Sequence, residues 1–323
     1  ELDLHHHPGI VVDPGQEYTS MQVLYGVARK GEARTALKKY IHSRMRRVVR
    51  GHDHPYANIA TCGAQDDPSE KFQAVTEEWC LNHISELAKA QRDAGLKFDN
   101  YDLEFWHDPK GDIKQADPKR FPNNLDNITP AINAIGTDLG LWLDSGFEIF
   151  DPSWTIGDNP ALSHTATVEG LNTICRCTAP ANQMYIDGFV HHIRKNHIRQ
   201  IKLDNLGPPD HRMPLCNNPK HDHLPGIYSI EANHNAQIEL LAALDQECPE
   251  VFFTLYWGHR SPWWLLFGDT VFDVGYNMEM ASLALRPALF RRSSNVRRLD
   301  QGRYLAARDF PMLGWDSLGV GFS

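Results

Sequence analysis

Residues 185–204, YIDGFVHHIRKNHIRQIKLD, contain the change of pattern that decides the fold. The first part, Tyr185 to Asn196, has the apolar spacing of an amphipathic helix. The second part, Ile198 to Asp204, is a short run rich in branched side chains and predicts a strand. A helix followed at once by such a strand is typical of the repeating unit of a parallel β-sheet.

The same alternation extends in both directions along the chain. Further strands are expected over Tyr56 to Cys62, Lys97 to Trp106, Leu139 to Asp144 and Val251 to Trp257. Further helices are expected over Thr76 to Ala94, Asn127 to Asp138 and Ala232 to Gln246. Strands that alternate with helices of this length predict an α/β protein with a parallel sheet.

Two architectures fit this alternation, an open doubly wound sheet and a closed barrel. The expected strands end in polar or aromatic clusters, and the active site of a barrel enzyme is built from the carboxyl ends of its strands. No glycine-rich phosphate loop follows the first strand, which disfavours nucleotide binding. We therefore predict an α/β fold of the (β/α)8 TIM-like barrel type. Residues 51–323 would form this barrel and a C-terminal tail, and residues 1–50 an arm and helix left from a preceding domain.

The composition is that of a globular protein without a basic surface. The 323 residues include 41 acidic and 32 basic side chains, for a formal net charge of -9. Nucleic acid is therefore not an expected partner, because a phosphate-backbone binder needs a basic surface. No window approaches the roughly eighteen uninterrupted apolar residues of a membrane span, so a membrane is not an expected partner either. The location and the oligomeric state stay open, with a secreted or periplasmic protein slightly favoured.

Four arginines follow one another closely near the end of the first helical pattern. Anion binding and a solvated helix face both fit such a run, and the solvated face is the expected one. These residues are Arg44, Arg46, Arg47 and Arg50.

The strand that ends at Asp204 carries the first chemical signal. Lys202 and Asp204 are two residues apart on a strand, so both side chains point to one face, which at a barrel mouth is the pocket. The lysine would keep the aspartate ionised, as a nucleophile that attacks an anomeric carbon requires. A structural salt bridge at the end of a strand is the alternative.

Four motifs in one order carry a resemblance to a known family. They are Trp106-His107-Asp108, Arg120-Phe121-Pro122-Asn123-Asn124-Leu125, Leu139-Gly140-Leu141-Trp142-Leu143 and Ile201-Lys202-Leu203-Asp204. This ordered set resembles the catalytic barrel of the α-galactosidase (melibiase) families 27 and 36 of glycoside hydrolases. The resemblance implies a retaining hydrolase in which Asp204 is the nucleophile and a second carboxyl group is the acid/base.

The chain departs from the family pattern at the second expected strand. The family commonly has two adjacent aspartates there, whereas this chain has Asp102-Leu103-Glu104-Phe105-Trp106. Asp102, Glu104 and Trp106 are therefore expected to bind substrate, but the sugar that they recognise can differ from galactose.

Two aspartates compete for the role of acid/base. Asp269 keeps a short Gly-Asp context, and Asp273 is nearer the position that follows the family's tryptophan. The prediction favours Asp269 by a small margin. The alternative is that both are loop caps and that the acid/base is missing.

The remaining substrate contacts are expected at other strand ends. Tryptophan can stack on a pyranose ring, although a buried core tryptophan is an equally good interpretation. Lysine and arginine can bind sugar hydroxyl groups or a substrate anion. These expected substrate-binding residues are Trp142, Asp144, Lys202, Trp257 and Arg260.

A proline-rich loop after Asp204 contains the densest histidine cluster. His211, Cys216, His221 and His223 offer imidazole and thiolate groups, which are zinc ligands. Their spacing matches no specific zinc motif, so a solvated loop is expected, with no metal and no cofactor.

These features together predict a glycoside hydrolase that cleaves α-galactoside-like bonds with retention, through a covalent intermediate on Asp204. Its expected partner is an oligosaccharide or glycoside substrate. The alternatives are a non-catalytic carbohydrate-binding barrel and a metal-dependent hydrolase that uses the histidine loop.

Overall fold

A computed structural model describes the greater part of the chain. The described residues are 11–19, 25–52, 56–61, 75–108, 112–144, 148–149, 172–173, 175, 177–204, 216–219, 221–256, 262–272 and 315–316.

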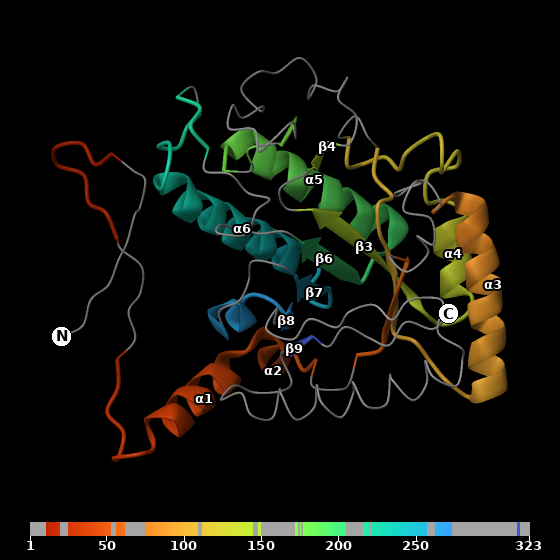
Figure 1. Cartoon of the computed structure of the whole chain (residues 1–323), viewed down its shortest axis with the longest axis horizontal. Coiled ribbons are helices and arrows are strands. Elements are labelled where there is room, and N and C mark those ends of the chain that lie inside the picture. The colour runs from red at the N-terminus through yellow and green to blue at the C-terminus, as the bar shows by residue number, and fades with distance from the viewer. Residues whose placement is uncertain are drawn as a thin grey trace, which may run out of the picture.

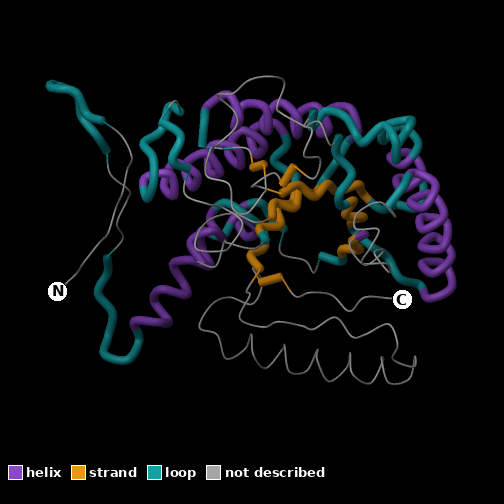
Figure 2. Tube along the Cα trace, turned by 45° about the horizontal axis from the view of Figure 1, so that its top comes forward, coloured by secondary structure: helices purple, strands orange, loops and turns teal. Residues whose placement is uncertain are grey.

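A curved sheet of seven strands forms the centre of the molecule (Figures 1 and 2). All neighbouring strands in it run parallel. The strands, in spatial order, are β1 (Asn58–Ala60), β2 (Asn100–Leu103), β3 (Asp138–Asp144), β6 (Gln200–Asp204), β7 (Phe252–Leu255), β8 (Thr270–Phe272) and β9 (Trp315–Asp316). A separate antiparallel pair consists of β4 (Glu148–Ile149) and β5 (Asn172–Thr173). The predicted parallel α/β sheet is confirmed, and an eighth parallel strand is not among the described residues.

Helices lie around the outside of this sheet (Figure 1). They are α1 (Ala33–Arg44), α2 (Arg46–Val49), α3 (Glu77–Ala94), α4 (Ile128–Asn133), α5 (Ala179–Asn196), α6 (Tyr228–Glu247) and the short 3-10 helix η4 (Pro262–Leu266). Among the described residues, no helix is both long and apolar enough to cross a membrane.

The ends of α3 follow from local sequence. Thr76 precedes the helix, and its hydroxyl oxygen accepts the Trp79 backbone N–H at 3.2 Å. Gly95 ends the helix with φ of 61°, a left-handed conformation that glycine adopts without strain. The predicted helix over this segment is therefore confirmed. The predicted helix at residues 127–138 is wrong at its end, since α4 stops at Asn133 and Asp138 already belongs to β3.

The strands divide their side chains between two environments. Outward side chains such as Leu141, Leu203 and Leu255 belong to the apolar core shared with the helices. Inward side chains are polar, because the two-residue period of a strand sends alternate residues to opposite faces. Polar side chains such as Asn100, Gln200 and Lys202 therefore line the inner face of the curved sheet toward the carboxyl ends of the strands.

One layer of this interior is a chain of amide and hydroxyl groups. Asn100 Nδ2 donates to Asn58 Oδ1 at 2.7 Å and to Gln200 Oε1 at 3.3 Å. Gln200 Nε2 donates in turn to Thr254 Oγ1 at 3.1 Å. Gly140 lies beside this layer, and a Cβ atom there would overlap the Asn100 and Gln200 amides. Position 140 therefore requires glycine, because the Asn100 and Gln200 side chains approach its backbone too closely for a Cβ atom.

The arginines of the first helical region do not all face solvent, so the expectation of a solvated face is wrong for two of them. Arg46 and Arg47 are each 5% exposed. Arg46 Nη2 lies 2.8 Å from Asp245 Oδ1 near the end of α6, and Arg47 Nε donates to the His52 carbonyl at 2.7 Å. The Arg46 contact attaches α2 to the end of α6, at the end of the sheet where the strands begin.

Candidate functional site

The carboxyl ends of β2, β3, β6 and β7 bring the predicted substrate-side residues together. In the sheet register, Trp142 is opposite Lys202, and Lys202 is opposite Thr254 on the other side. Asp144 is opposite Asp204 one pleat further along. The pairing of the backbone thus places these residues at the same end of the sheet.

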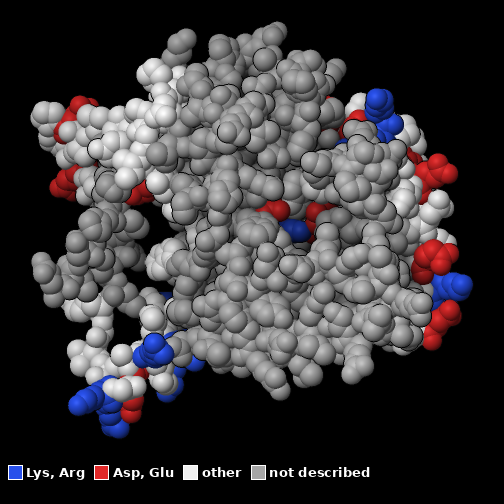
Figure 3. Space-filling model, in the orientation of Figure 1, with Lys and Arg blue, Asp and Glu red and all other residues white. Residues whose placement is uncertain are grey.

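An ammonium group between two carboxylates forms the floor of this site. Lys202 Nζ lies 2.5 Å from Glu104 Oε1 and 3.8 Å from Asp102 Oδ2. The same Nζ lies 4.3 Å from the centre of the Tyr256 ring. All three charged side chains are buried. Acidic and basic side chains come into view together near the centre of the face in Figure 3. A buried set of this kind needs its partners in place, because an unpaired buried charge is costly.

Asp204 ends β6 at the rim of the same site. The indole Nε1 of Trp142 donates to Asp204 Oδ2 at 3.0 Å. Lys202, which was expected to keep Asp204 ionised, makes its short contact with the Glu104 carboxylate. The orientation of the Asp204 carboxylate is thus held from the neighbouring strand by an aromatic N–H donor.

Trp106 and Trp142, both predicted to contact substrate, are buried and mainly hold other residues of the site in place. Trp106 is 0% exposed, and its Nε1 donates to the Trp142 carbonyl at 2.7 Å. Trp142 is 3% exposed and packs on Phe105, with 4.5 Å between ring centres. The prediction of Trp106 as a substrate contact is therefore wrong, because the core encloses its ring completely.

Residues of the Arg-Phe-Pro motif support this site from behind. The Arg120 guanidinium donates to the Phe105 carbonyl, and its Nε donates to Asp117 at 2.7 Å. Phe105 has φ of 53°, an unusual value for a non-glycine residue. The contact from Arg120 holds this turn at the end of β2. The sequence did not predict that Arg120, Phe105 and Tyr256 support the site. Their contacts join segments that are far apart in the chain.

Asp269, the preferred acid/base prediction, lies at the wrong end of the sheet. It immediately precedes β8, and its N–H donates to the Phe253 carbonyl at 2.9 Å. Its carboxylate accepts the Phe253 N–H at 2.7 Å, lies 3.0 Å from His52 Nδ1 and pairs with Arg46. The side chain is 0% exposed. A carboxylate that is so fully bonded, at the amino ends of the strands, has a structural role and cannot reach a substrate beside Asp204.

The structure does not describe the side chains of several predicted site residues. Asp273, Trp257, Arg260 and His211 lie outside the described residues, and Asp144 is described through its backbone. In the sequence, Asp273 is the residue after Phe272, where β8 ends.

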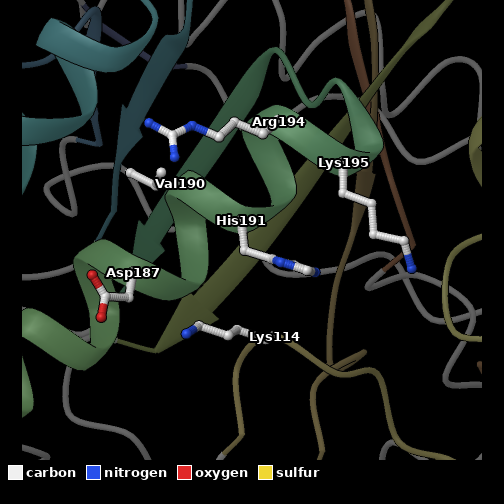
Figure 4. A pocket seen from close by; sticks show the side chains of 6 residues that line it. All are labelled: Lys114, Asp187, Val190, His191, Arg194 and Lys195. Carbon is white, nitrogen blue, oxygen red and sulfur yellow. The ribbon is translucent and has the colours of Figure 1, made fainter.

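A hollow of about 440 Å³ lies elsewhere, on the outer face of α5 (Figure 4). It is lined by Lys114, Asp187, Val190, His191, Arg194 and Lys195. Arg194 makes two 2.7 Å contacts with Glu247, and Lys195 Nζ lies 2.9 Å from Asp126. Two of its cations are thus neutralised by surface partners, and its lining includes none of the side chains around Asp204. We do not assign the reaction to this hollow.

The residues that could hold a metal ion lie on the loops that lead into α5 and α6. Cys175, Cys216, His221 and His223 each offer a ligand atom, and these atoms all lie within 4.8 Å of one another. This cluster includes three of the four residues noted in the sequence and adds Cys175.

Solved structures of similar fold are α-galactosidases. A family GH36 α-galactosidase AgaA variant of Geobacillus stearothermophilus, in complex with stachyose, matches with a TM-score of 0.54 and 13% identity over 74% of this chain and 33% of its own. The α-galactosidase of Lactobacillus brevis matches with a TM-score of 0.54 and 14% identity over 74% of this chain and 32% of its own. No family model and no curated protein sequence matches the chain.

The chain therefore has an α-galactosidase-like fold, as the ordered motifs predicted. It spans about a third of the length of the enzymes that it resembles.

Proposed function

We propose that this protein is a retaining glycoside hydrolase that cleaves α-galactoside-like bonds, and that its sheet belongs to a complete (β/α)8 barrel. The observation that carries the proposal is the position of Asp204. Its carboxylate ends β6 beside Lys202 and is oriented by the Trp142 N–H at 3.0 Å. The α-galactosidase fold adds support, since this end of the sheet is where barrel enzymes do their chemistry.

Asp204 is the nucleophile of the proposed reaction. Its oxygen would attack the anomeric carbon as the bond to the leaving oxygen breaks, which gives a covalent glycosyl ester. Water would then attack the same carbon and release Asp204 as a carboxylate. The Trp142 N–H holds the carboxylate in one orientation, which reduces the entropy lost on reaching the transition state.

Asp273 replaces Asp269 as the proposed acid/base. It directly follows β8 in the sequence, and the carboxyl end of β8 is on the same side of the sheet as Asp204. The acid/base gives a proton to the leaving oxygen in the first step and removes one from water in the second. In a retaining enzyme the two carboxyl groups are about 5–5.5 Å apart.

The buried charge set would recognise sugar hydroxyl groups. Glu104 offers acceptor oxygens and Lys202 offers donors, and this combination suits the paired hydroxyl groups of a pyranose ring. Asp102, which is 0% exposed, would act through the Lys202 ammonium group and not by direct contact with the sugar. Asp144, Trp257 and Arg260 remain proposed contacts from other strand ends. Trp142 acts chiefly through Asp204.

A panel of 4-nitrophenyl α-glycosides tests this function. The panel contains the galactoside, N-acetylgalactosaminide, glucoside and fucoside, each assayed with wild type, Asp204→Asn, Asp273→Asn and Asp269→Asn. We expect release from at least one sugar and a loss of roughly 10³-fold or more in kcat for Asp204→Asn. Asp269→Asn is the matched control, and it should keep its activity per folded molecule.

The outcomes separate the alternatives. Full activity in Asp204→Asn would contradict the assignment of the nucleophile. If wild type binds α-galactosides but releases nothing from any substrate, the protein is a carbohydrate-binding barrel. The stereochemistry is tested by NMR of the first product formed, and a β-anomer from an α-glycoside would contradict the retaining mechanism.

A further inference from the structure

Four metal-ligating side chains from two separate segments meet near the starts of α5 and α6. Cys175 Sγ lies 3.1 Å from His223 Nε2, and Cys216 Sγ lies 3.2 Å from His221 Nδ1. Cys175 and Cys216 are each 2% exposed, and both histidines are partly buried. Two thiols and two imidazoles therefore surround one small volume.

The two segments also meet through other contacts. The Ala179 N–H at the start of α5 donates to Asp222 Oδ2 at 3.0 Å. Cys177 Sγ donates to the Ser229 carbonyl at 3.4 Å, at the start of α6. The starts of both helices lie at the same end of the molecule in Figure 1. The meeting of the four side chains is thus part of a wider junction between the loops.

The type and the separation of the ligand atoms suit zinc. Two thiolates and two imidazoles in a tetrahedron are one of the ligand sets of structural Zn²⁺, with Zn–S of about 2.3 Å and Zn–N of about 2.0–2.1 Å. These bond lengths require ligand atoms about 3.3–3.8 Å apart. The two closest pairs here are slightly nearer than that, and all four atoms are within 4.8 Å. Small side-chain movements would place them on one ion.

The surrounding hydrogen bonds already orient two of the four ligands. His223 Nδ1 lies 2.9 Å from the Leu224 carbonyl, so in the neutral ring Nδ1 carries the proton and Nε2, 3.1 Å from Cys175 Sγ, is the nitrogen that can bind a metal. The Cys216 backbone donates to Ser229 Oγ at 3.1 Å and accepts the Gly226 N–H at 2.8 Å. Such second contacts are typical of ligands that are held ready for an ion.

We propose that Cys175, Cys216, His221 and His223 bind one structural Zn²⁺. With four protein ligands the ion has no open position for water or substrate, so it does not carry out hydrolysis. It joins the chain that enters α5 to the chain that connects Asp204 with α6. The ion would thereby fix loops that leave the carboxyl ends of β3 and β6. This proposal does not depend on the proposed glycosidase activity.

If His221 binds zinc, the side-chain amide of Asn218 must change its orientation. Its Nδ2 lies 2.9 Å from His221 Nε2. With zinc on Nδ1, Nε2 carries the proton, so the amide must turn its oxygen toward the ring.

The test is the metal content of the whole chain. The protein is purified under reducing conditions with added zinc and then dialysed exhaustively against metal-free buffer without chelator. We expect one zinc per chain in wild type and a loss of zinc in Cys216→Ser and His223→Asn. Cys248→Ser is the matched control, because Cys248 follows the far end of α6, and it should retain the ion.

A second measurement uses the wild-type protein alone, so it does not depend on the folding of the variants. Cobalt replaces zinc in the wild-type protein, and thiolate ligands give a charge-transfer absorption together with the visible bands of a tetrahedral ion. The histidines His5, His6 and His7 cannot produce the thiolate band. Zinc far below one per chain, no thiolate band, zinc retained in Cys216→Ser, or a Cys175–Cys216 disulfide in the purified protein would each overturn the proposal.

Discussion

At the scale of single residues, the site depends on one indole N–H. Trp142 donates to Asp204 from the neighbouring strand, and Trp142 is itself held by Phe105 and by the Trp106 indole. A charged oxygen that accepts one fixed donor keeps one orientation, which a nucleophile needs for attack along a defined line. Trp142 is therefore a positioning residue in the proposed reaction.

Trp142→Phe tests this role. The change removes the donor but keeps an aromatic ring, and a hydrogen bond to a charged group is worth about 1.5–3 kcal/mol. We expect kcat/KM for the best panel substrate to fall roughly 10- to 100-fold, mainly through kcat. Trp264→Phe, a change in the core away from Asp204, is the control and should affect stability alone. An unchanged kcat in Trp142→Phe would remove the positioning role.

At the scale of elements, α2 is fixed to the parallel sheet and to α6 by ion pairs of the buried Arg46 at the amino ends of the strands. Arg46 pairs with Asp269 before β8 and with Asp245 on α6, and its guanidinium lies 4.4 Å from the centre of the Phe253 ring. The segment that contains α1 and α2 is thus part of the same packed unit as the sheet, since Met45 and Ile41 also join the main core.

Removal of the Arg46 charge should destabilise the whole unit. Loss of one partner from a buried ion pair costs about 3–5 kcal/mol, because the other charge is left unpaired. We expect Arg46→Met to lower the free energy of unfolding by about that amount in urea titration. Arg50→Met is the control: Arg50 also pairs with Asp245 but is 37% exposed, so its loss should cost less than about 1 kcal/mol. Equal losses would contradict the buried role of Arg46.

At the scale of the whole molecule, two buried histidines tie stability to pH. Burial, with the Arg120 charge, lowers the pKa of His107 to about 3. Burial also lowers the pKa of His192 to about 4, against a weaker contrary effect of its contact with the Ile113 carbonyl. Both are neutral when folded, whereas an unfolded histidine gains its proton near pH 6.5. The unfolded state therefore binds more protons below that pH.

The free energy of unfolding should consequently fall as pH drops below about 6.5 and continue to fall toward the two folded pKa values. Each histidine contributes a slope of up to about 1.4 kcal/mol per pH unit. Urea titrations between about pH 7 and pH 5.5 measure this slope before most carboxylates titrate. His192→Gln should make it shallower, and His42→Gln, at an exposed position, should leave it unchanged. An unchanged slope in His192→Gln would contradict the burial of His192 in its neutral form.

The sequence by itself determined the parallel α/β sheet, the order of its main elements and the end of the sheet where we propose the site. These features follow from periods of 2 and 3.6 residues and from caps such as Thr76 and Gly95, which are local properties of the chain. The Lys202 and Asp204 pair could be placed on one face for the same reason.

Only the tertiary structure decided what the individual polar residues do. Asp269 is joined to Arg46, Trp106 is enclosed by the core, and Cys175 meets Cys216, His221 and His223 across a long stretch of sequence. The role of a carboxylate, an indole or a thiol depends on which distant groups pack against it. Those contacts arise from strand register and loop path, which no short-range pattern in the sequence specifies.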